Sequence, residues 1–263
     1  MGERKTNKFH KSGKTIDEYY TIYEEVKYIF QNIIDKDQLK NKIIYCPFDN
    51  DKSSFVKYLN EHKELEYKEL WWTSDDYHNH EDLIEKADII ISNPPFSLLH
   101  KSILPMMKKF NKKFFLFGSI MMIYNYILYF SPECCKYIRR QNFPFITPFI
   151  SYTTGKNETY VNGTIYMTNI ELKKDYDEKI TPSFFTNNDI DNIYLEDHLV
   201  IDKMKDYPKY IMSPVWCPLT AIEYRYSKFL EYLGQNTYYR RNDKSIYSDG
   251  KSRFIRVLMK RKK

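Results

Sequence analysis

The sequence predicts an open α/β fold with a mostly parallel sheet, followed by a smaller second lobe of mixed α+β structure. Short apolar segments rich in Ile, Phe and Trp alternate with segments whose apolar residues recur at helical spacing. Turns with Pro, Asn or Asp separate the two kinds of segment. This alternation is typical of Rossmann-like sheets that helices cover on both faces.

The elements of the first part of the chain follow one another at short intervals. A helix is expected at residues 19–34, where apolar residues recur every three or four positions and Asp17 can cap the start. The others are a strand at 42–46, a helix at 55–59, a strand at 66–72, a helix at 81–86, a strand at 89–92, a helix at 98–110 and a strand at 113–117. Ligands of such folds bind beyond the carboxyl ends of the strands, so we expect the chemistry just after Cys46, Trp72 and Ser92.

The pattern changes after about residue 130, where prolines interrupt aromatic segments. We therefore expect a first domain at residues 1–130 and a second lobe at 131–263. Within the second lobe, the sequence predicts a strand at 163–169, a helix near 220–233 and a basic strand at 254–259.

Composition indicates a folded protein, because 42% of the residues are apolar and 29% are charged. The formal net charge of +6 suits a polyanionic partner, although many soluble proteins have a similar charge. Lys and Arg gather near both ends of the chain, where they can bind phosphate or form solvated tails.

Neither a metal site nor a membrane span is expected. Four cysteines (Cys46, Cys134, Cys135 and Cys217) form no Cys-x-x-Cys pair, which argues against a disulfide framework or a zinc site and fits a reducing compartment. No secretory signal begins the chain, and the uncharged stretch 114–130 is shorter than the roughly 20 residues of a span. We expect a cytoplasmic protein, with 114–130 forming a buried strand and helix.

The segment Asn93-Pro94-Pro95-Phe96 follows the apolar strand 89–92 directly. The Asn93 side-chain oxygen and the Pro94 backbone carbonyl can accept the two hydrogens of a planar exocyclic amine, and the rigid prolines fix both acceptors. Phe96 can stack on a base that has been extruded from a duplex. The alternative is a stiff turn in which Asn93 bonds to its own backbone.

With this segment the chain resembles the amino-methyltransferases, and within them the EcoRI-type adenine-specific DNA methyltransferases. The matching segments occur in the family's order at 17–21, 45–49, 54–55, 88–97, 111–118, 165–169 and 205–208. The resemblance implies a Rossmann-like methyltransferase sheet, S-adenosyl-L-methionine as cofactor and Asn93, Pro94, Pro95 and Phe96 as catalytic residues. It also implies that double-stranded DNA is the partner and that a flipped adenine receives the methyl group at N6.

The resemblance places the cofactor against two segments, at 20–21 and 46–49. The residues concerned are Tyr20, Thr21, Cys46, Pro47, Phe48 and Asp49. Asp49 can bind the cofactor's α-amino group or ribose hydroxyls, and Asp75 can bind ribose hydroxyls. Asp49-Asn50-Asp51 can equally be an ordinary turn or helix cap. The chain departs from the wider family in having no Gly-x-Gly after the first strand, and it has the unexpectedly apolar sequence Ser119-Ile-Met-Met122.

Several other residues have both a functional and an ordinary structural interpretation. Trp71 and Trp72 can line the cofactor's adenine or end a buried strand, and His78 with His80 can suggest a metal or lie in a solvated loop. Candidate DNA contacts in the second lobe, which otherwise are surface charges, are Arg139, Arg140, Arg240 and Arg241.

Two further functions stay open at this point. One keeps the chemistry but changes the acceptor to an adenine in RNA, cytosine N4 or a protein glutamine. The other is a methyltransferase-like DNA-binding module without turnover, which the missing glycine loop would fit. The sequence is compatible with a monomer, and with a cognate restriction endonuclease that acts on the same DNA site.

Overall fold

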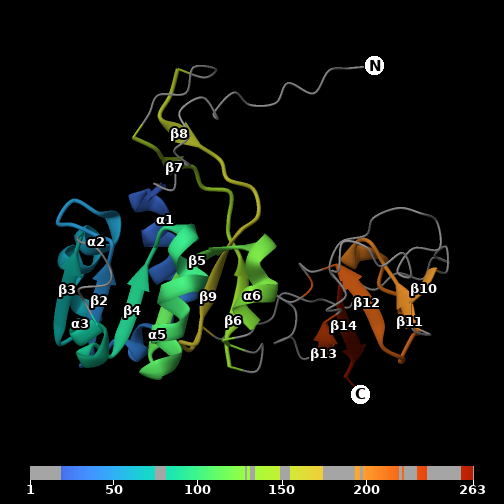
Figure 1. Ribbon diagram of the computed structural model, residues 1–263. Helices are drawn as coiled ribbons and strands as arrows, with labels where there is room; N and C mark the ends of the chain where they lie inside the picture. The colour runs from blue at the N-terminus through green and yellow to red at the C-terminus, as the bar shows by residue number, and fades with distance from the viewer. Residues whose placement is uncertain are drawn as a thin grey trace.

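A six-stranded sheet forms the centre of the computed structural model, which describes residues 19–74, 81–127, 129–130, 134–148, 155–173, 193–195, 198–218, 221, 230–235 and 256–262. The strand order is β3-β2-β4-β5-β9-β6 (Figure 1). The strands are β2 (Ile43–Pro47), β3 (Glu69–Thr73), β4 (Ile89–Ser92), β5 (Lys113–Ser119), β6 (Lys136–Arg139) and β9 (Thr164–Thr168).

The sheet is parallel through its first four strands and mixed at its far end. β2 pairs in parallel with both β3 and β4, and β4 pairs in parallel with β5. β9 is antiparallel to β5 and to β6, so β6 runs in the same direction as β5. The expected Rossmann-like α/β fold is therefore confirmed, and the carboxyl ends of β2, β4, β5 and β6 meet at one edge.

Helices cover both faces of the sheet, because successive strand residues point to opposite sides. Ile89 and Ile91 of β4 pack with α1 (Tyr23–Tyr28) and α2 (Ser54–Glu61). Between them, Ile90 packs on the other side with α3 (Glu81–Lys86), α5 (Leu104–Lys109) and α6 (Ile123–Ile127). The continuous apolar strands of the sequence thus reflect a sheet that is buried on both sides.

Two of the expected helices are interrupted by wider turns. The first expected helix begins as α1 and continues as a π-helical turn at Ile29–Ile33, and residues 20–21 before it form the strand β1 (Tyr20–Thr21). The helix after Asn93 consists of α4 (Phe96–Leu98), a π-helical turn at Leu99–Ile103 and α5. Asp17 lies outside the described residues, and Ser53 caps α2 by accepting from the Val56 N–H at 3.2 Å.

A small three-stranded sheet stands above one edge of the central sheet in Figure 1. It has the order β1-β7-β8, with β7 at Phe145–Ile146 and β8 at Glu158–Thr159. β1 pairs with β7 through Tyr20 opposite Ile146 and Thr21 opposite Phe145. The start of the described chain is thereby fixed to a segment that follows β6.

The boundary that we expected between residues 130 and 131 is not where the central sheet ends. β6 and β9 come after residue 130 and still hydrogen-bond into that sheet. Sequence alternation did not reveal this, because β9 inserts between β5 and β6 rather than following them in order.

A second, five-stranded sheet follows later in the chain, with the order β10-β11-β12-β14-β13. Its strands are β10 (Ile193–Leu195), β11 (His198–Val200), β12 (Val215–Pro218), β13 (Leu230–Gln235) and β14 (Arg256–Arg261). The expected helix near 220–233 is wrong at its end, because residues 230–235 pair antiparallel with β14 and this pairing overrides their helical spacing. The expected basic strand is confirmed as β14.

The uncharged stretch that begins at residue 114 does not form a span. It begins inside β5, passes through a 3₁₀ turn at Ile120–Met122 and enters α6. Among the described residues, no helix has the length and apolarity to cross a membrane.

Candidate active site

The ends of β2 and β4 bring together two of the sequence segments that we singled out. β2 ends at Pro47 and β4 at Ser92, and the Ser92 hydroxyl donates to the Pro47 carbonyl at 2.5 Å. The same hydroxyl oxygen lies 3.4 Å from Oδ2 of Asp49. Asp49 and Asn93 therefore leave the sheet from adjacent strands, at the edge where open α/β folds bind ligands.

The Asn93 amide is held in one orientation by the backbone of Tyr19. Its Nδ2 donates to the Tyr19 carbonyl oxygen at 2.5 Å. A carbonyl oxygen only accepts hydrogen bonds, so the NH₂ group must face Tyr19 and the side-chain oxygen must point away from it. Asn93 thus presents an oriented hydrogen-bond acceptor at the end of β4.

Aromatic rings pack beside this amide. Phe96, the first residue of α4, stacks on Tyr19 with 6.4 Å between ring centroids and 29° between ring planes. The Tyr19 ring also contacts Phe145 of β7, at 5.7 Å between centroids. Pro94 is buried, whereas Asn93, Pro95 and Phe96 are half-buried. The motif is therefore partly accessible to a ligand, and contacts with Tyr19 fix the positions of the Asn93 amide and the Phe96 ring.

The loop after β2 makes its turn without glycine. Phe48 adopts φ +66°, the left-handed conformation that glycine normally supplies. Such a conformation costs a bulky residue about 1–3 kcal/mol and is concentrated at functional sites. In this loop a strained Phe48 therefore makes the turn that glycine residues make in other methyltransferases. It lies between Pro47, which is buried, and Asp49, which is half-buried.

Asp49 is a carboxyl group in an unfavourable place for charge. Burial raises its pKa to about 7, and the neighbouring Ser53 and Ser92 hydroxyls oppose the rise only in part. A half-buried carboxyl with such a pKa is a candidate functional group, since a bound cation would stabilise the ionised form.

Thr21 contributes a second polar group to the same region. Its hydroxyl is buried and makes no hydrogen bond to the described residues. The Ser54 hydroxyl donates to the Thr21 carbonyl at 2.6 Å, which joins β1 to the start of α2. The next residue back, Tyr20, is 51% exposed. The two expected cofactor segments, 20–21 and 46–49, are therefore brought to the same end of the sheet.

A buried ion pair that sequence patterns do not reveal supports this arrangement. Glu25 of α1 accepts two hydrogen bonds from Arg140, both at 2.6 Å, and a third from the Tyr166 hydroxyl at 2.7 Å. The Arg140 guanidinium also lies 3.7 Å from the centroid of the Phe145 ring. Burial raises the pKa of Glu25, while Arg140 and Tyr166 oppose the rise. Arg140 is thus engaged inside the protein rather than presented to a partner.

The remaining expected residues are more dispersed. Arg139 is exposed at the end of β6; Trp71 is half-buried, and Trp72 is 40% exposed on β3. Asp75, His78, His80, Arg240 and Arg241 lie outside the described residues. Within the part of the chain that the structure describes, no group of three metal-ligating side chains occurs.

The α/β sheet with an oriented amide and a half-buried carboxyl at one edge, together with a relative that spans the full chain, supports a methyltransferase as the class of protein. The relative is the Type II methyltransferase M.EcoRI from Escherichia coli, 24% identical over an alignment of 333 residues that covers 100% of this chain and 99% of that protein. No protein-family model matches the chain.

A solved structure from Pyrococcus horikoshii, of a protein proposed to be an RNA methyltransferase, has a TM-score of 0.38 and 12% identity to this chain. That match covers 59% of this chain and 88% of the other.

Proposed function

We propose that this protein is a site-specific DNA methyltransferase that transfers a methyl group from S-adenosyl-L-methionine to N6 of a flipped adenine in duplex DNA. The observation that carries the proposal is the Asn93 amide, whose NH₂ group is held by the Tyr19 carbonyl at 2.5 Å beside the Phe96 ring. This arrangement fixes an acceptor next to an aromatic surface, which is what an exocyclic amine on a planar ring requires.

The proposed role of the motif follows from the weak nucleophilicity of adenine N6, whose lone pair is delocalised into the ring. Asn93 Oδ1 accepts one N6 hydrogen and the Pro94 carbonyl accepts the other, so the nitrogen is oriented towards the methyl donor. Phe96 stacks on the extruded base. Bound S-adenosyl-L-methionine supplies a methyl group on a sulfonium, and no residue of the chain has to form a covalent intermediate.

The residues around the β2 loop fit this cofactor. The buried Thr21 hydroxyl, which has no partner among the described residues, can bond to the methionine part. The Asp49 carboxylate can bind the α-amino group, because a cation offsets the cost of burying its charge. Tyr20, Cys46, Pro47 and Phe48 would form the surrounding surface.

The raised pKa of Asp49 makes cofactor binding pH-dependent. We expect the dissociation constant for S-adenosyl-L-methionine to rise as pH falls from 8 to 5.5, by up to about tenfold per pH unit below pH 7, because protonation removes the charge that binds the α-amino group. Isothermal titration calorimetry across this range measures the effect.

Asp49→Asn should bind the cofactor weakly at every pH, whereas Asp51→Asn, an exposed change in the same turn, should keep both the affinity and its pH dependence. The free energy of unfolding should change with pH in the opposite direction to the cofactor affinity. Because the pKa of Asp49 rises from 3.8 to about 7 on folding, its contribution to stability is fully present below about pH 4 and is lost as pH rises from there through 7. The cofactor-free protein should therefore resist urea better at pH 6 than at pH 8 through this group. Cofactor affinity that is flat with pH would contradict the role of Asp49.

The identity of the product tests the function as a whole. Purified protein is incubated with methyl-labelled S-adenosyl-L-methionine and duplex DNA of mixed sequence, and the nucleosides are separated by mass spectrometry. N6-methyladenine is the expected product. Label in N4-methylcytosine, or label only when RNA is supplied, would instead support the other acceptors, and cofactor and DNA binding without any transfer would support a binding module.

A further inference from the structure

A cleft lies at the same edge of the central sheet as Asn93. It has a volume of about 650 Å³, within the range of ligand-binding clefts, and lies where β5 and β6 end and β9 begins. We call it the β6 groove. The residues that give it its chemical character are Arg139, Gln141, Asn142, Phe143, Tyr160 and Asn162.

The β6 groove is cationic and rich in amides. None of the described residues that line it is acidic. Of its two arginines, Arg140 is neutralised by Glu25, so the net positive charge comes from Arg139. The Gln141, Asn142 and Asn162 side chains are exposed and make no hydrogen bond to other described residues. Amides and arginine are the side chains that bond to base edges and phosphates.

The position of the groove relative to Asn93 matches the spacing of nucleotides. Asn93 directly follows β4, and β5, β9 and β6 lie next to β4 in this order across the sheet. Neighbouring strands lie roughly 4.8 Å apart, so the groove lies about 10–15 Å from Asn93 along the edge. Nucleotides of one strand in B-DNA are spaced by about 3.4 Å, so this span corresponds to roughly three or four positions.

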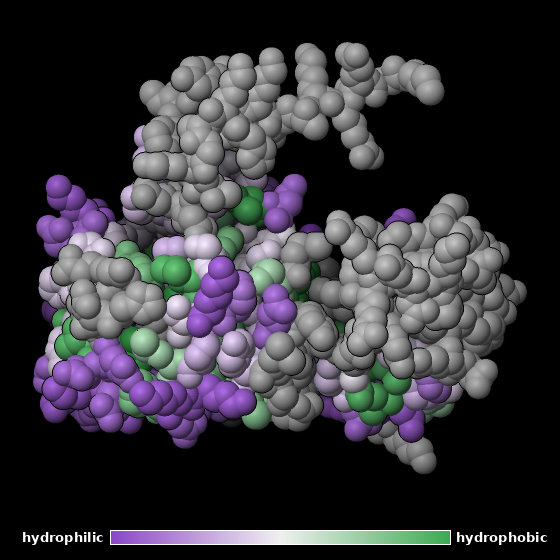
Figure 2. Space-filling view, in the orientation of Figure 1, coloured by the Kyte–Doolittle hydropathy of each residue, from purple (hydrophilic) through white to green (hydrophobic). Residues whose placement is uncertain are grey.

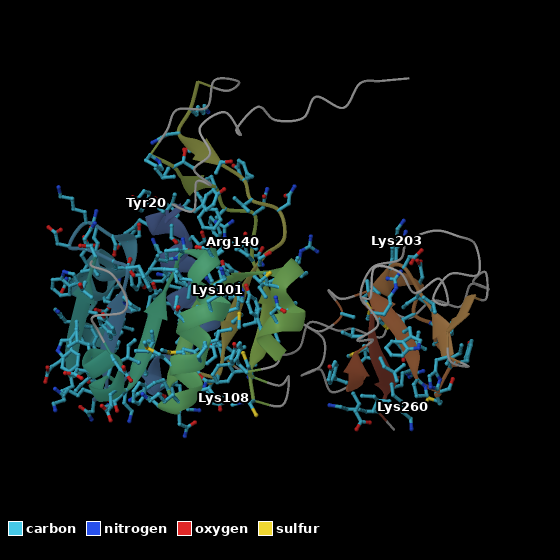
Figure 3. The ribbon with its side chains drawn as sticks, in the orientation of Figure 1. Tyr20, Lys101, Lys108, Arg140, Lys203 and Lys260 are labelled. Carbon is cyan, nitrogen blue, oxygen red and sulfur yellow. The ribbon has the colours of Figure 1, made fainter. Side chains whose placement is uncertain are left out.

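The groove is also connected to the Asn93 amide through residues that contact one another. Residues 139–143 lead into β7, whose Phe145 contacts both Arg140 and Tyr19. Tyr19 in turn holds the Asn93 amide. Figure 3 labels Tyr20 and Arg140 at the same upper end of the central sheet, whereas Lys108 lies at the opposite end. A strand that occupies the groove would therefore be aligned with the acceptor amide.

We propose, resting on the proposed function, that the β6 groove binds one strand of the DNA duplex beside the flipped adenine and reads a base about three or four positions away. Arg139 contacts a phosphate, and the amides of Gln141 and Asn142 read base edges. Tyr160, which is 57% exposed, packs against the sugar–phosphate chain. These residues thereby determine part of the sequence specificity.

DNA binding tests the phosphate contact without requiring turnover. Fluorescence anisotropy is measured with a labelled 30-base-pair duplex library at several salt concentrations. Arg139→Gln should weaken binding by about five- to tenfold at low salt and reduce the slope of log affinity against log salt by about one. Lys108→Gln removes the same charge from the hydrophilic lower margin seen in Figure 2 and should change neither.

Base reading is tested by sequencing the N6-methyladenine that each variant leaves in a randomised duplex library. Asn142→Ala and Gln141→Ala should relax the preference by about tenfold at a position within four nucleotides of the target. An unchanged preference in both variants, with unchanged binding by Arg139→Gln, would overturn the proposal.

The two proposals fail separately. If the wild-type protein methylates DNA, and the groove variants match it in DNA binding and in sequence preference, the proposed function stands and the groove proposal is refuted. Absent methylation with a weakened Arg139→Gln complex supports the groove and refutes the function. A loss of affinity for single-stranded RNA alone would replace DNA by RNA as the partner and overturn the groove proposal as stated.

Discussion

Asn93→Ala is expected to reduce the rate of methyl transfer at least about a hundredfold, while the dissociation constant for S-adenosyl-L-methionine stays within about threefold. The variant loses the oxygen that accepts an amine hydrogen and also the NH₂ group that donates to the Tyr19 carbonyl. Both losses act on the acceptor base, whereas the cofactor residues belong to β1 and the β2 loop. Single-turnover transfer and calorimetry measure the two quantities separately.

Two further variants show which part of the amide matters. Asn93→Asp keeps an acceptor oxygen but loses the donor to Tyr19 and places a negative charge beside that carbonyl, so its rate should fall between those of wild type and Asn93→Ala. Asn60→Ala removes an exposed amide on α2 whose oxygen accepts from Lys63, and it should leave the rate unchanged. A fully active Asn93→Ala would exclude the proposed clamp.

Glu25→Gln is expected to lower the free energy of unfolding by about 3–5 kcal/mol, because it leaves the buried Arg140 guanidinium without its counter-charge. That loss is large against a typical total of roughly 5–15 kcal/mol. Urea unfolding followed by circular dichroism gives the value. The exposed pair of Lys40 and Glu66 offers the matched control, and Glu66→Gln should leave the unfolding midpoint unchanged.

The double variant Glu25→Leu with Arg140→Met separates loss of charge balance from loss of packing. Replacing both members of a buried ion pair by apolar side chains is often neutral, so this variant should recover most of the stability that Glu25→Gln loses. If the double variant is as unstable as the single one, the hydrogen bonds to Glu25 stabilise the fold in a way that apolar packing cannot replace.

Local patterns predicted the parallel half of the fold. The strand at 89–92 and the helix at 81–86 lie where they were expected, because each is a clear run with turn residues at its ends. The insertion of β9 beside β5 was not predicted, since strand order is set by long-range pairing rather than by periodicity. The helix expected near 220–233 fails for a related reason, because pairing with β14 decides the structure of residues 230–235.

The residues of the candidate site also divide into those that local patterns predicted and those that long-range contacts determine. Asn93 to Phe96 and the 46–49 segment stood out as motifs at strand ends, and the structure places both at one edge of the sheet. Tyr19 and the pairing of Glu25 with Arg140 gave no comparable signal, although Arg140 was expected as a DNA contact and Thr21 as a cofactor residue. Tyr19 acts through its backbone carbonyl, which any residue has, and Glu25 is 115 positions from its partner. Ser92 is the exception, since a hydroxyl that ends an otherwise apolar strand could have been singled out.

The pairing of β1 with β7 has a consequence for how the protein is made. The chain leaves the ribosome N-terminus first, so residues 88–97 are available well before Phe145 and Ile146. Until those two residues emerge, β1 has no partner strand to hold Tyr19 against Asn93. Contacts between such distant segments form late in folding. The nascent chain should therefore pair its four parallel strands, β3, β2, β4 and β5, before it acquires an ordered acceptor amide, whereas β9 joins the sheet only after β7 has been synthesised.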